Sequence, residues 1–280
     1  MRFVIVASPR TGSSHLVSLL SAHPDILCNG NSLHPKHMWL SWPKKDLTKS
    51  VKAELAELRE RDPNAFLERL YTAGFGRSHV GLKIFDKQNN AALRKLLANS
   101  EIRKILLYRK NVLANYSSRL AARSNNEWSV KEGRPVSPPP AVRFDEEEFI
   151  RFHDRYVSFY QDVLGRLSHH RQPFHFIEYL DINEPFLFAG LVSFIGADPA
   201  KLDSPAPLRA RQAKQNSPDI VSRFLNASDV VNFLERYGLE HWSREGETSI
   251  TAIGAKQGNQ PVPPDPALHD PESVKTAEVH

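Results

Sequence analysis

Stretches of consecutive apolar residues alternate along the chain with stretches in which apolar residues recur at helical spacing. A continuous apolar run at 2–8 predicts a strand buried on both faces, and further strands are predicted at 79–85, 102–108 and 174–179. Because strands alternate with helices, we predict an α/β fold in which a parallel β-sheet has helices on both faces. The helices that this periodicity predicts lie at 12–22, 43–70 (with breaks near Pro43 and Pro63), 88–99, 111–123, 145–169, 184–195 and 227–238.

The same pattern predicts a single domain followed by a tail. Asp145, with Glu148 three residues later, resembles a capping box that opens the helix after it. Residues 125–143 are polar, contain the run PVSPPP, and are predicted to form a loop. The end of the chain is rich in Gly, Pro and polar residues. We therefore predict one α/β domain over 1–246 and a disordered C-terminal tail over 247–280.

Composition narrows the partners that we expect. The formal net charge is +5 and the sequence pI is about 9.3, which favours an anionic ligand. The basic residues are scattered among acidic ones, so no nucleic-acid binding is predicted. Cys28 is the only cysteine, which excludes an internal disulfide and a cysteine-rich metal site. No stretch approaches the roughly 18 apolar residues of a membrane span, and we expect a cytoplasmic protein.

The first predicted strand ends in a turn that is rich in polar groups, Ser-Pro-Arg-Thr-Gly-Ser-Ser. Backbone N–H groups at the start of the following helix attract an anion, and Gly12 lets the backbone approach it closely. Hydroxyl donors come from Thr11, Ser13 and Ser14, and Arg10 adds a fixed positive charge. We predict that this turn holds a phosphate or sulfate group. The alternative is an ordinary capped turn between a strand and a helix.

A second turn of the same kind follows the strand at 102–108. Arg109 stands at the end of that strand, and Ser117 lies eight residues later in the next helix. An arginine and a hydroxyl placed in this way can hold one phosphate from two sides. Taken alone, the pair is more typical of a solvated arginine and an ordinary helical serine than of a phosphate site. Neither a Walker A loop nor a Gly-x-Gly-x-x-Gly motif is present.

In this order, the two turns resemble the phosphate motifs of sulfotransferases that use 3′-phosphoadenosine 5′-phosphosulfate (PAPS). The first turn is similar to their 5′-phosphosulfate loop, and Arg109 with Ser117 is similar to their 3′-phosphate motif. Arg10 stands where cytosolic sulfotransferases carry lysine, which resembles the bacterial carbohydrate branch of trehalose and nodulation sulfotransferases. The resemblance covers about residues 2–240 and implies a P-loop-like sheet. Further stretches that resemble this branch are HPDILCNGNSLHP, VGLKIFDKQN, FIEYLDINEPFLFAGLVSFIGAD and AKQNSPDIVSRFLN.

The resemblance implies an enzyme that moves a sulfuryl group from PAPS to a hydroxyl of a carbohydrate or glycolipid acceptor. It requires no metal, and it does not indicate the oligomeric state. Arg109 and Ser117 would hold the 3′-phosphate, Lys214 would add to the cofactor site, and Arg10 would stabilise charge on the transferred group. The residues assigned to the 5′-phosphosulfate would be Arg10, Thr11, Gly12, Ser13, Ser14 and His15.

One position departs from the family pattern. The bacterial branch commonly carries a Gly-Glu pair soon after the first helix, and this chain has Gly30-Asn31 there. An asparagine amide does not accept a proton at neutral pH, so the usual general base is missing. His34 is the nearest replacement, because an unperturbed histidine pKa of about 6.5 suits the task. Weaker candidates for the base are His37, Lys83 and Asp86.

Three functions therefore remain open. An altered or slow sulfotransferase ranks first, since the loss of a general base costs about 10²- to 10⁴-fold in rate. A non-catalytic PAPS- or anion-binding relative is favoured by Asn31. A degenerate P-loop kinase should carry a Gly-Lys-Ser/Thr run and an acidic Mg²⁺ ligand, which the first turn lacks. The nearby Met38, Trp39 and Trp42 either line the acceptor site or pack in the core.

Overall fold

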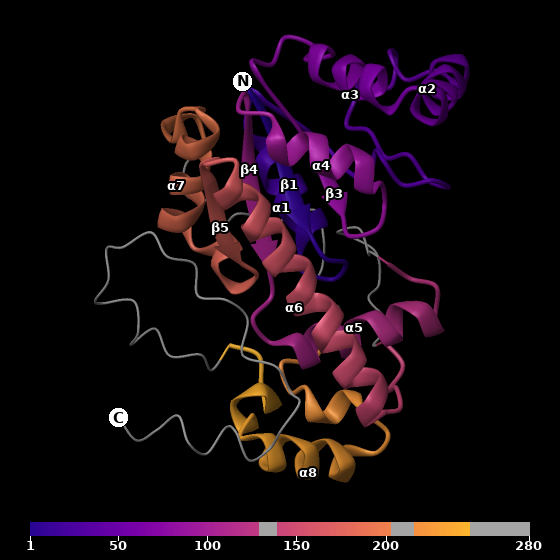
Figure 1. Ribbon diagram of the computed structural model, residues 1–280, viewed down its shortest axis with the longest axis vertical. Helices are drawn as coiled ribbons and strands as arrows, with labels where there is room; N and C mark the ends of the chain where they lie inside the picture. The colour runs from indigo at the N-terminus through magenta and orange to yellow at the C-terminus, as the bar shows by residue number, and fades with distance from the viewer. Residues whose placement is uncertain (129–138, 203–215, 247–280) are drawn as a thin grey trace. The chain divides into compact units, whose positions relative to one another are not determined.

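The computed structural model of the protein describes residues 1–128, 139–202 and 216–246 (Figure 1). Its strands are β1 Arg2–Ala7, β2 Ile26–Asn29, β3 His79–Phe85, β4 Ile102–Tyr108 and β5 Phe174–Glu178. Its α-helices are α1 Ser13–Ala22, α2 Lys49–Arg61, α3 Pro63–Thr72, α4 Asn90–Ala98, α5 Val112–Ser124, α6 Glu146–His169, α7 Pro185–Ile195 and α8 Ala227–Tyr237. Short 3-10 turns lie at Leu180–Asn183, Pro199–Lys201, Val221–Arg223 and Glu240–Ser243.

The five strands form one parallel sheet in the order β2-β3-β1-β4-β5. The central strand β1 is the most buried, and its residues from Phe3 to Ala7 are fully covered. The chain leaves β1 towards one edge of the sheet, at β2, and leaves β4 towards the other edge, at β5. The carboxyl ends of β1 and β4 therefore lie where the connections diverge, which is where ligands bind in open α/β sheets. The predicted fold class is confirmed.

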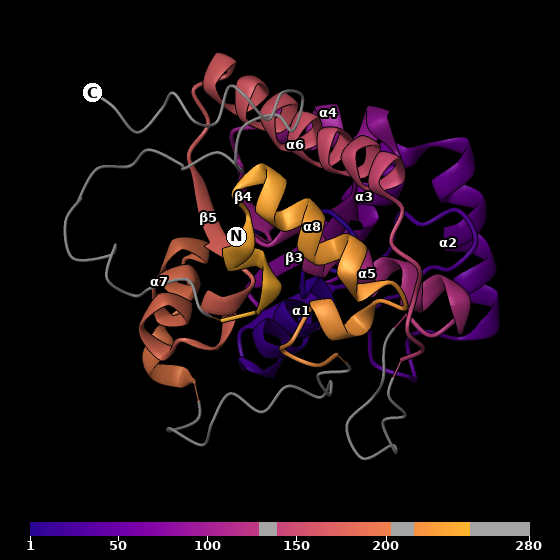
Figure 2. The same cartoon turned by 90° about the horizontal axis from the view of Figure 1, so that it is seen from below.

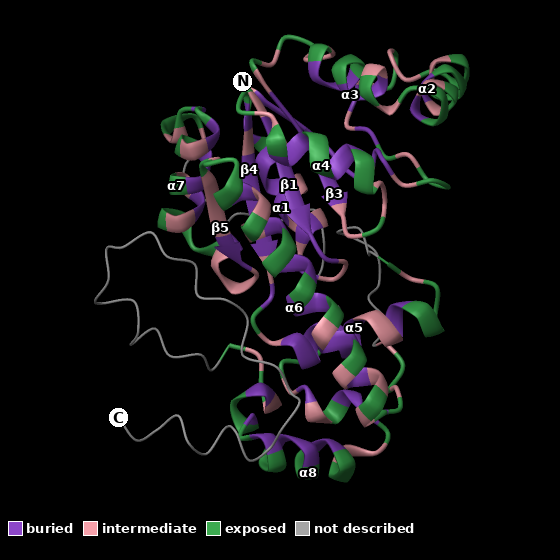
Figure 3. Ribbon diagram, in the orientation of Figure 1, coloured by how far each residue is buried: buried purple, intermediate pink, exposed green. Residues whose placement is uncertain are grey.

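Apolar side chains alternate across the sheet and attach a helical layer to each face. Phe3, Ile5 and Ala7 belong to a core cluster with Leu16 of α1 and Phe188 of α7. Figure 2 shows α1 and α7 on one side of the strands and α4 on the other. Figure 3 shows that β1 to β4 are buried along almost their whole length, whereas the first three residues of the edge strand β5 are only partly buried. Burial on both faces explains why their sequences are continuously apolar.

The strand β2 is absent from the sequence prediction. Its four residues, Ile26–Asn29, pair with β3 from the register Ile26↔His79 onwards. A run this short, ending at Gly30, does not reach the length at which a strand can be recognised from periodicity. The consequence for the site is that Asn29 and the residues after it lie at the carboxyl edge of the sheet.

The predicted helix at 43–70 begins later and is divided as expected. Thr48 caps α2, and Asp62 ends α2 and caps α3, whose first residue is Pro63. The capping residue at the start of α6 is confirmed, because the backbone N–H of Glu148 donates to the Asp145 side chain at 2.8 Å. Most of the predicted 125–143 loop, and the whole 247–280 tail, lie outside the described residues.

The internal contacts divide the chain into two compact units. One unit consists of Met1–Tyr108 with Val163–Gln212, and the other of Arg109–Asp162 with Ala213–His280. The second unit has its own aromatic core, in which the Phe144 ring lies 5.3 Å from the Phe233 ring and 5.6 Å from the Phe224 ring between centroids. A single domain over 1–246 stays a prediction.

Gly81 of β3 is expected to tolerate no side chain. A Cβ atom at this position would lie 2.2 Å from the ring of fully buried Phe3, its register partner in β1. We expect Gly81→Ala to lower the free energy of unfolding by about 1–3 kcal/mol, measured by urea denaturation. Gly190→Ala is the matched control, because a Cβ at Gly190 meets no atom within 4 Å and alanine favours the helix. An unchanged Gly81→Ala midpoint would contradict this packing.

Candidate active site

The turn between β1 and α1 is tight and depends on glycine. Gly12 has a φ of 80°, in the left-handed region, and Arg10 has a φ of 69°. A Cβ atom on Gly12 would lie 2.6 Å from the Tyr179 ring, so space and conformation both require glycine. Fully buried Thr11 donates from Oγ1 to the Ser8 carbonyl oxygen at 2.7 Å, which closes the turn. This geometry brings the chain from the centre of the sheet directly into α1.

The N-terminus of α1 is left without a side-chain cap. Gly12 offers no side chain to the first N–H groups, and the first turn contains no acidic residue. Helix N–H groups in this state are donors for a bound anion. Among the described residues, α2 to α6 are each capped by a side chain, from Thr48, Asp62, Asn89, Asn111 and Asp145 respectively. The starts of α7 and α8 also lack a side-chain cap, so the missing cap at α1 supports an anion site only together with the glycine turn and the polar groups around it.

Lys83 of β3 reaches this helix start from the neighbouring strand. Its side chain is on the same face as Ile5, its register partner, and its Nζ donates to Ser14 Oγ at 3.0 Å. Burial lowers the pKa of Lys83 to about 7. The residue is 1% exposed. From the sequence, Lys83 is only a weak candidate for the base. Its position within the apolar run VGLKIF was the feature that could have indicated a buried amine.

The other residues predicted in this turn take different positions. Ser13 is buried, whereas Arg10 and Ser14 are half-buried. His15 Nε2 lies 2.7 Å from Asn183 Oδ1. Burial lowers the pKa of His15, so its neutral form is favoured. His15 therefore adds a polar group to the helix start and no positive charge near pH 7.

Polar atoms without partners gather after β2, at the position where the family carries glutamate. Within the described part of the chain, Asn29 Nδ2, Asn31 Oδ1 and Ser32 Oγ are buried and make no hydrogen bond. Trp39 lies against Gly30, where a Cβ atom would be 3.2 Å from its ring. The Trp39 side chain remains 45% exposed. Buried polar atoms without partners are costly, so a ligand or water that supplies hydrogen bonds would be stabilised here.

The geometry of His34 does not favour the role of base. Its Nδ1 accepts hydrogen bonds from the backbone N–H groups of Lys36, at 3.2 Å, and His37, at 3.1 Å. In neutral imidazole this leaves the proton on Nε2, so the nitrogen that could accept a proton is already used. Burial, followed by the charges of His37 and Arg59, lowers the pKa of His34. Of the aromatic residues considered for the acceptor site, Trp42 is buried against Phe75.

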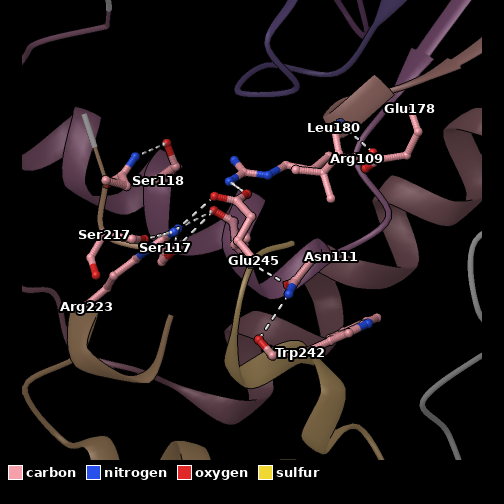
Figure 4. A network of polar contacts seen from close by, with 12 residues as sticks. Arg109, Asn111, Ser117, Ser118, Glu178, Leu180, Ser217, Arg223, Trp242 and Glu245 are labelled. Carbon is pink, nitrogen blue, oxygen red and sulfur yellow. Dashed lines mark hydrogen bonds and ion pairs between the residues drawn. The ribbon is translucent and has the colours of Figure 1, made fainter. Parts of the chain in front are cut away.

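Arg109 and Ser117 lie in the second unit, in one polar network (Figure 4). The Tyr156 hydroxyl accepts from the Arg109 backbone N–H at 2.7 Å and donates to the Arg109 carbonyl oxygen at 3.1 Å. The Arg109 guanidinium forms an ion pair with Glu245. Arg223 donates to Ser117 Oγ at 3.2 Å and lies 3.3 Å from the Glu245 carboxylate. The two predicted residues are therefore connected through two residues that the sequence analysis missed.

Local sequence explains how this network is held. Asn111 caps α5, accepting from Ala114 N–H at 2.9 Å, and its amide donates to the Trp242 carbonyl oxygen at 3.0 Å. Arg223 lies in the stretch AKQNSPDIVSRFLN, which carries part of the family resemblance, so the sequence could have indicated it as a site residue. Nothing comparable in the sequence indicates Glu245. Lys214 lies outside the described residues.

Residues 1–128, 139–202 and 216–246 contain no group of three or more His, Cys, Asp or Glu side chains placed to hold a metal ion. Over the same ranges, no helix is both long and apolar enough to cross a membrane.

Comparison with known proteins identifies relatives along most of the chain. No protein-family model matches it. Nodulation protein H of Rhizobium tropici is 29% identical over 218 residues, which cover 76% of this chain and 82% of that protein. Nodulation protein H of Rhizobium meliloti is 27% identical over 224 residues, covering 76% of this chain and 84% of that protein. These relatives confirm the resemblance to bacterial sulfotransferases that the sequence predicts, and they support a transferase enzyme.

Two solved structures resemble this chain less closely than the nodulation proteins do in sequence. The sulfotransferase domain of the Synechococcus PCC 7002 olefin synthase is 15% identical, with a TM-score of 0.47 over 79% of this chain and 82% of that one. The sulfotransferase from Alicyclobacillus acidocaldarius is 17% identical, with a TM-score of 0.43 over 87% of this chain and 99% of that one. At these TM-scores the structural likeness adds no weight to the sequence relationship.

Lys83→Met should stabilise the sulfotransferase most at or below about pH 7. The folded pKa of Lys83, about 7, lies below the ordinary value of 10.5 that the residue regains on unfolding. Between these values the unfolded chain binds more protons, so the wild-type free energy of unfolding rises with pH in this window. Methionine binds no proton, and the variant lacks this slope.

Urea unfolding between about pH 7 and pH 10 measures the difference. Lys52→Met, at an exposed position of α2, is the matched control and should unfold in parallel with the wild type. Curves for Lys83→Met that run parallel to the wild type would contradict the lowered pKa.

Proposed function

We propose that this sulfotransferase moves a sulfuryl group from PAPS to a hydroxyl of a carbohydrate or glycolipid acceptor. The observation that carries the proposal is the uncapped start of α1, with the buried Lys83 amine 3.0 Å from Ser14 Oγ. Such a site offers N–H donors, hydroxyls and a latent positive charge to a phosphosulfate group. PAPS, when bound, supplies the activated sulfuryl group.

The residues present suit a doubly phosphorylated nucleotide. Arg10 and the segment Thr11–His15 are assigned to the 5′-phosphosulfate, and Arg109 with Ser117 to the 3′-phosphate. Lys214 is retained as a further cofactor residue on the family resemblance alone. An anion near Lys83 raises the pKa of its amine, so Lys83 would take up a proton when the ligand binds. Arg10 and protonated Lys83 would then stabilise the charge that develops during transfer.

The acceptor hydroxyl is assigned to the end of β2. Asn31 Oδ1 is a buried acceptor that lacks a donor among the described residues, and a substrate O–H would supply one. Asparagine can orient this hydroxyl without removing its proton, so we expect slow transfer. The exposed face of Trp39, beside Gly30, offers an apolar surface to a sugar ring or a lipid chain.

A proton acceptor is still needed for an alcohol. His34 remains the candidate suggested by the sequence, but its Nδ1 already accepts two backbone N–H groups. The same asparagine supports a second function, a relative that binds PAPS or another anion without turnover. A kinase is less favoured, because the turn after β1 lacks the Gly-Lys-Ser/Thr run of phosphate-loop kinases.

Nucleotide binding is the first test. Calorimetric titration should show that adenosine 3′,5′-bisphosphate binds more tightly than AMP or Mg-ATP, because only the bisphosphate presents a 3′-phosphate. Arg109→Gln should weaken bisphosphate binding by about tenfold or more and leave AMP unchanged, since a charge-assisted phosphate contact contributes about 1.5–3 kcal/mol. Arg123→Gln, which changes an exposed arginine on α5, the helix that follows Arg109, is the matched control. Preferential Mg-ATP binding would favour the kinase, and no bisphosphate binding would overturn the proposal.

Position 31 is the second test. Asn31→Glu should raise the rate at which PAPS is converted to the bisphosphate in the presence of carbohydrate acceptors, by about 10²-fold or more. Asn31→Gln is the control for size, because it has the length of glutamate without a proton acceptor. Equal rates for these two variants would show that position 31 does not place the base. Activity in none of the proteins, with tight bisphosphate binding, would favour the non-catalytic relative.

A further inference from the structure

The carboxylate of Glu245 lies between two buried arginines. Its side chain is 2% exposed, and those of its ion-pair partners Arg109 and Arg223 are 4% and 7% exposed. One oxygen pairs with Arg109, and the other lies 3.3 Å from Arg223 Nη2 (Figure 4). Arg223 also donates to Ser117 Oγ at 3.2 Å. A single acidic side chain thus pairs directly with Arg109 of the predicted 3′-phosphate motif, and it is connected to Ser117, the other member, through Arg223.

Glu245 lies in a short stretch of chain that follows the last 3-10 turn of the described residues. Its backbone N–H donates to the Pro218 carbonyl oxygen at 2.8 Å. The Ile220 N–H donates to the Ser243 carbonyl oxygen at 2.8 Å, beside an isolated bridge between Asp219 and Arg244. No helix or strand of the described residues contains Glu245. Backbone hydrogen bonds on either side of it and the ion pairs with Arg109 and Arg223 position the carboxylate.

The donor set suits an anion of higher charge than a carboxylate. Two guanidinium groups carry two positive charges, and arginine forks match the oxygens of a phosphate group. A phosphate monoester carries close to two negative charges near pH 7 and offers three oxygens. A carboxylate carries one charge and offers two. The exchange of Glu245 for a phosphate group would therefore improve the charge balance.

A phosphate and the Glu245 carboxylate cannot share these donors. Both are anions, and two like charges a few ångströms apart in a dry site repel strongly. We propose that Glu245 is an internal competitor that occupies the 3′-phosphate site, and that a 3′-phosphorylated nucleotide binds only when this carboxylate leaves. Arg223 then becomes a third group that holds the 3′-phosphate. This inference rests on the proposed function for the assignment of Arg109 and Ser117.

The test is the affinity of Glu245→Gln for nucleotides that differ only in their phosphates. We expect adenosine 3′,5′-bisphosphate and adenosine 3′-monophosphate to bind to Glu245→Gln about tenfold more tightly than to the wild type, a difference of about 1.4 kcal/mol. Adenosine 5′-monophosphate, which has no 3′-phosphate, should bind both proteins equally. Glu240→Gln removes an exposed carboxylate five positions earlier, and it should behave as the wild type throughout.

Stability gives a second readout. Without Glu245 the two arginines lose their shared carboxylate, so Glu245→Gln should melt at a lower temperature than the wild type. Addition of the bisphosphate should raise the melting temperature of the variant more than that of the wild type. Glu245→Ala is the second variant, and we expect the same tighter binding of the 3′-phosphorylated nucleotides to it. It replaces Glu245→Gln in the test if the glutamine variant does not fold.

The outcomes separate this inference from the proposed function. Unchanged or weaker binding of both 3′-phosphorylated ligands to the Glu245 variants overturns the inference. The same result is compatible with the proposed function, provided that the wild type still binds the bisphosphate more tightly than AMP. Tighter binding of all three nucleotides, 5′-monophosphate included, also overturns it, because the effect would then not be specific to the 3′-phosphate. The absence of any bisphosphate binding, by the wild type and by the variants, overturns both.

Discussion

The left-handed backbone of Gly12 is the constraint on which the first part of the site depends. The Tyr179 ring covers this position so closely that no side chain fits. A residue that cannot carry a side chain cannot cap the helix that follows it, so the first N–H groups of α1 stay available. The same turn places Ser14 where the Lys83 amine reaches it from β3. Conformation, packing and anion affinity therefore have one common origin.

The protein buries positive charge in two chemically different ways. No carboxylate in the described part of the chain forms an ion pair with Lys83, and burial lowers the pKa of its amine to about 7, so it can lose its charge when no anion is near. Arg109 and Arg223 share the carboxylate of Glu245 instead. A guanidinium keeps its proton under all ordinary conditions, so a buried arginine needs a partner where a buried lysine does not. In our proposals, an anion reaches Lys83 with uptake of a proton and reaches the arginines by exchange for Glu245.

Asn31 separates the position of the acceptor from the removal of its proton. The buried amide oxygen can accept a hydrogen bond from a hydroxyl, but it has no useful basicity. In the proposed reaction, the asparagine still orients the acceptor hydroxyl, but the transfer is slower. Positioning and general-base catalysis are separate contributions to lowering the barrier. The unpartnered atoms of Asn29 and Ser32 beside it indicate that the site is built for polar contacts with something else.

The sequence by itself determined the architecture and the two phosphate motifs. Four long apolar strands, and helices with clear 3.6-residue periodicity, are local patterns, so the α/β fold followed from them. The turn residues Arg10 to Ser14 and the pair Arg109 and Ser117 are also local, with fixed spacing. The strand β2 was missed because four residues carry too little periodicity, although its pairing with β3 is unambiguous in the sheet.

Only the tertiary structure decided which distant residues meet. Lys83 lies 69 positions from Ser14, and Glu245 lies 136 positions from Arg109, so no local pattern connects them. The pKa of Lys83 depends on burial, which a spacing in the sequence does not report. His34 illustrates the opposite error, because its residue type suggested a base while its backbone contacts occupy the nitrogen that would accept the proton. Residue types and spacing predict the kind of chemistry, whereas burial and long-range contacts decide which side chains are available to perform it.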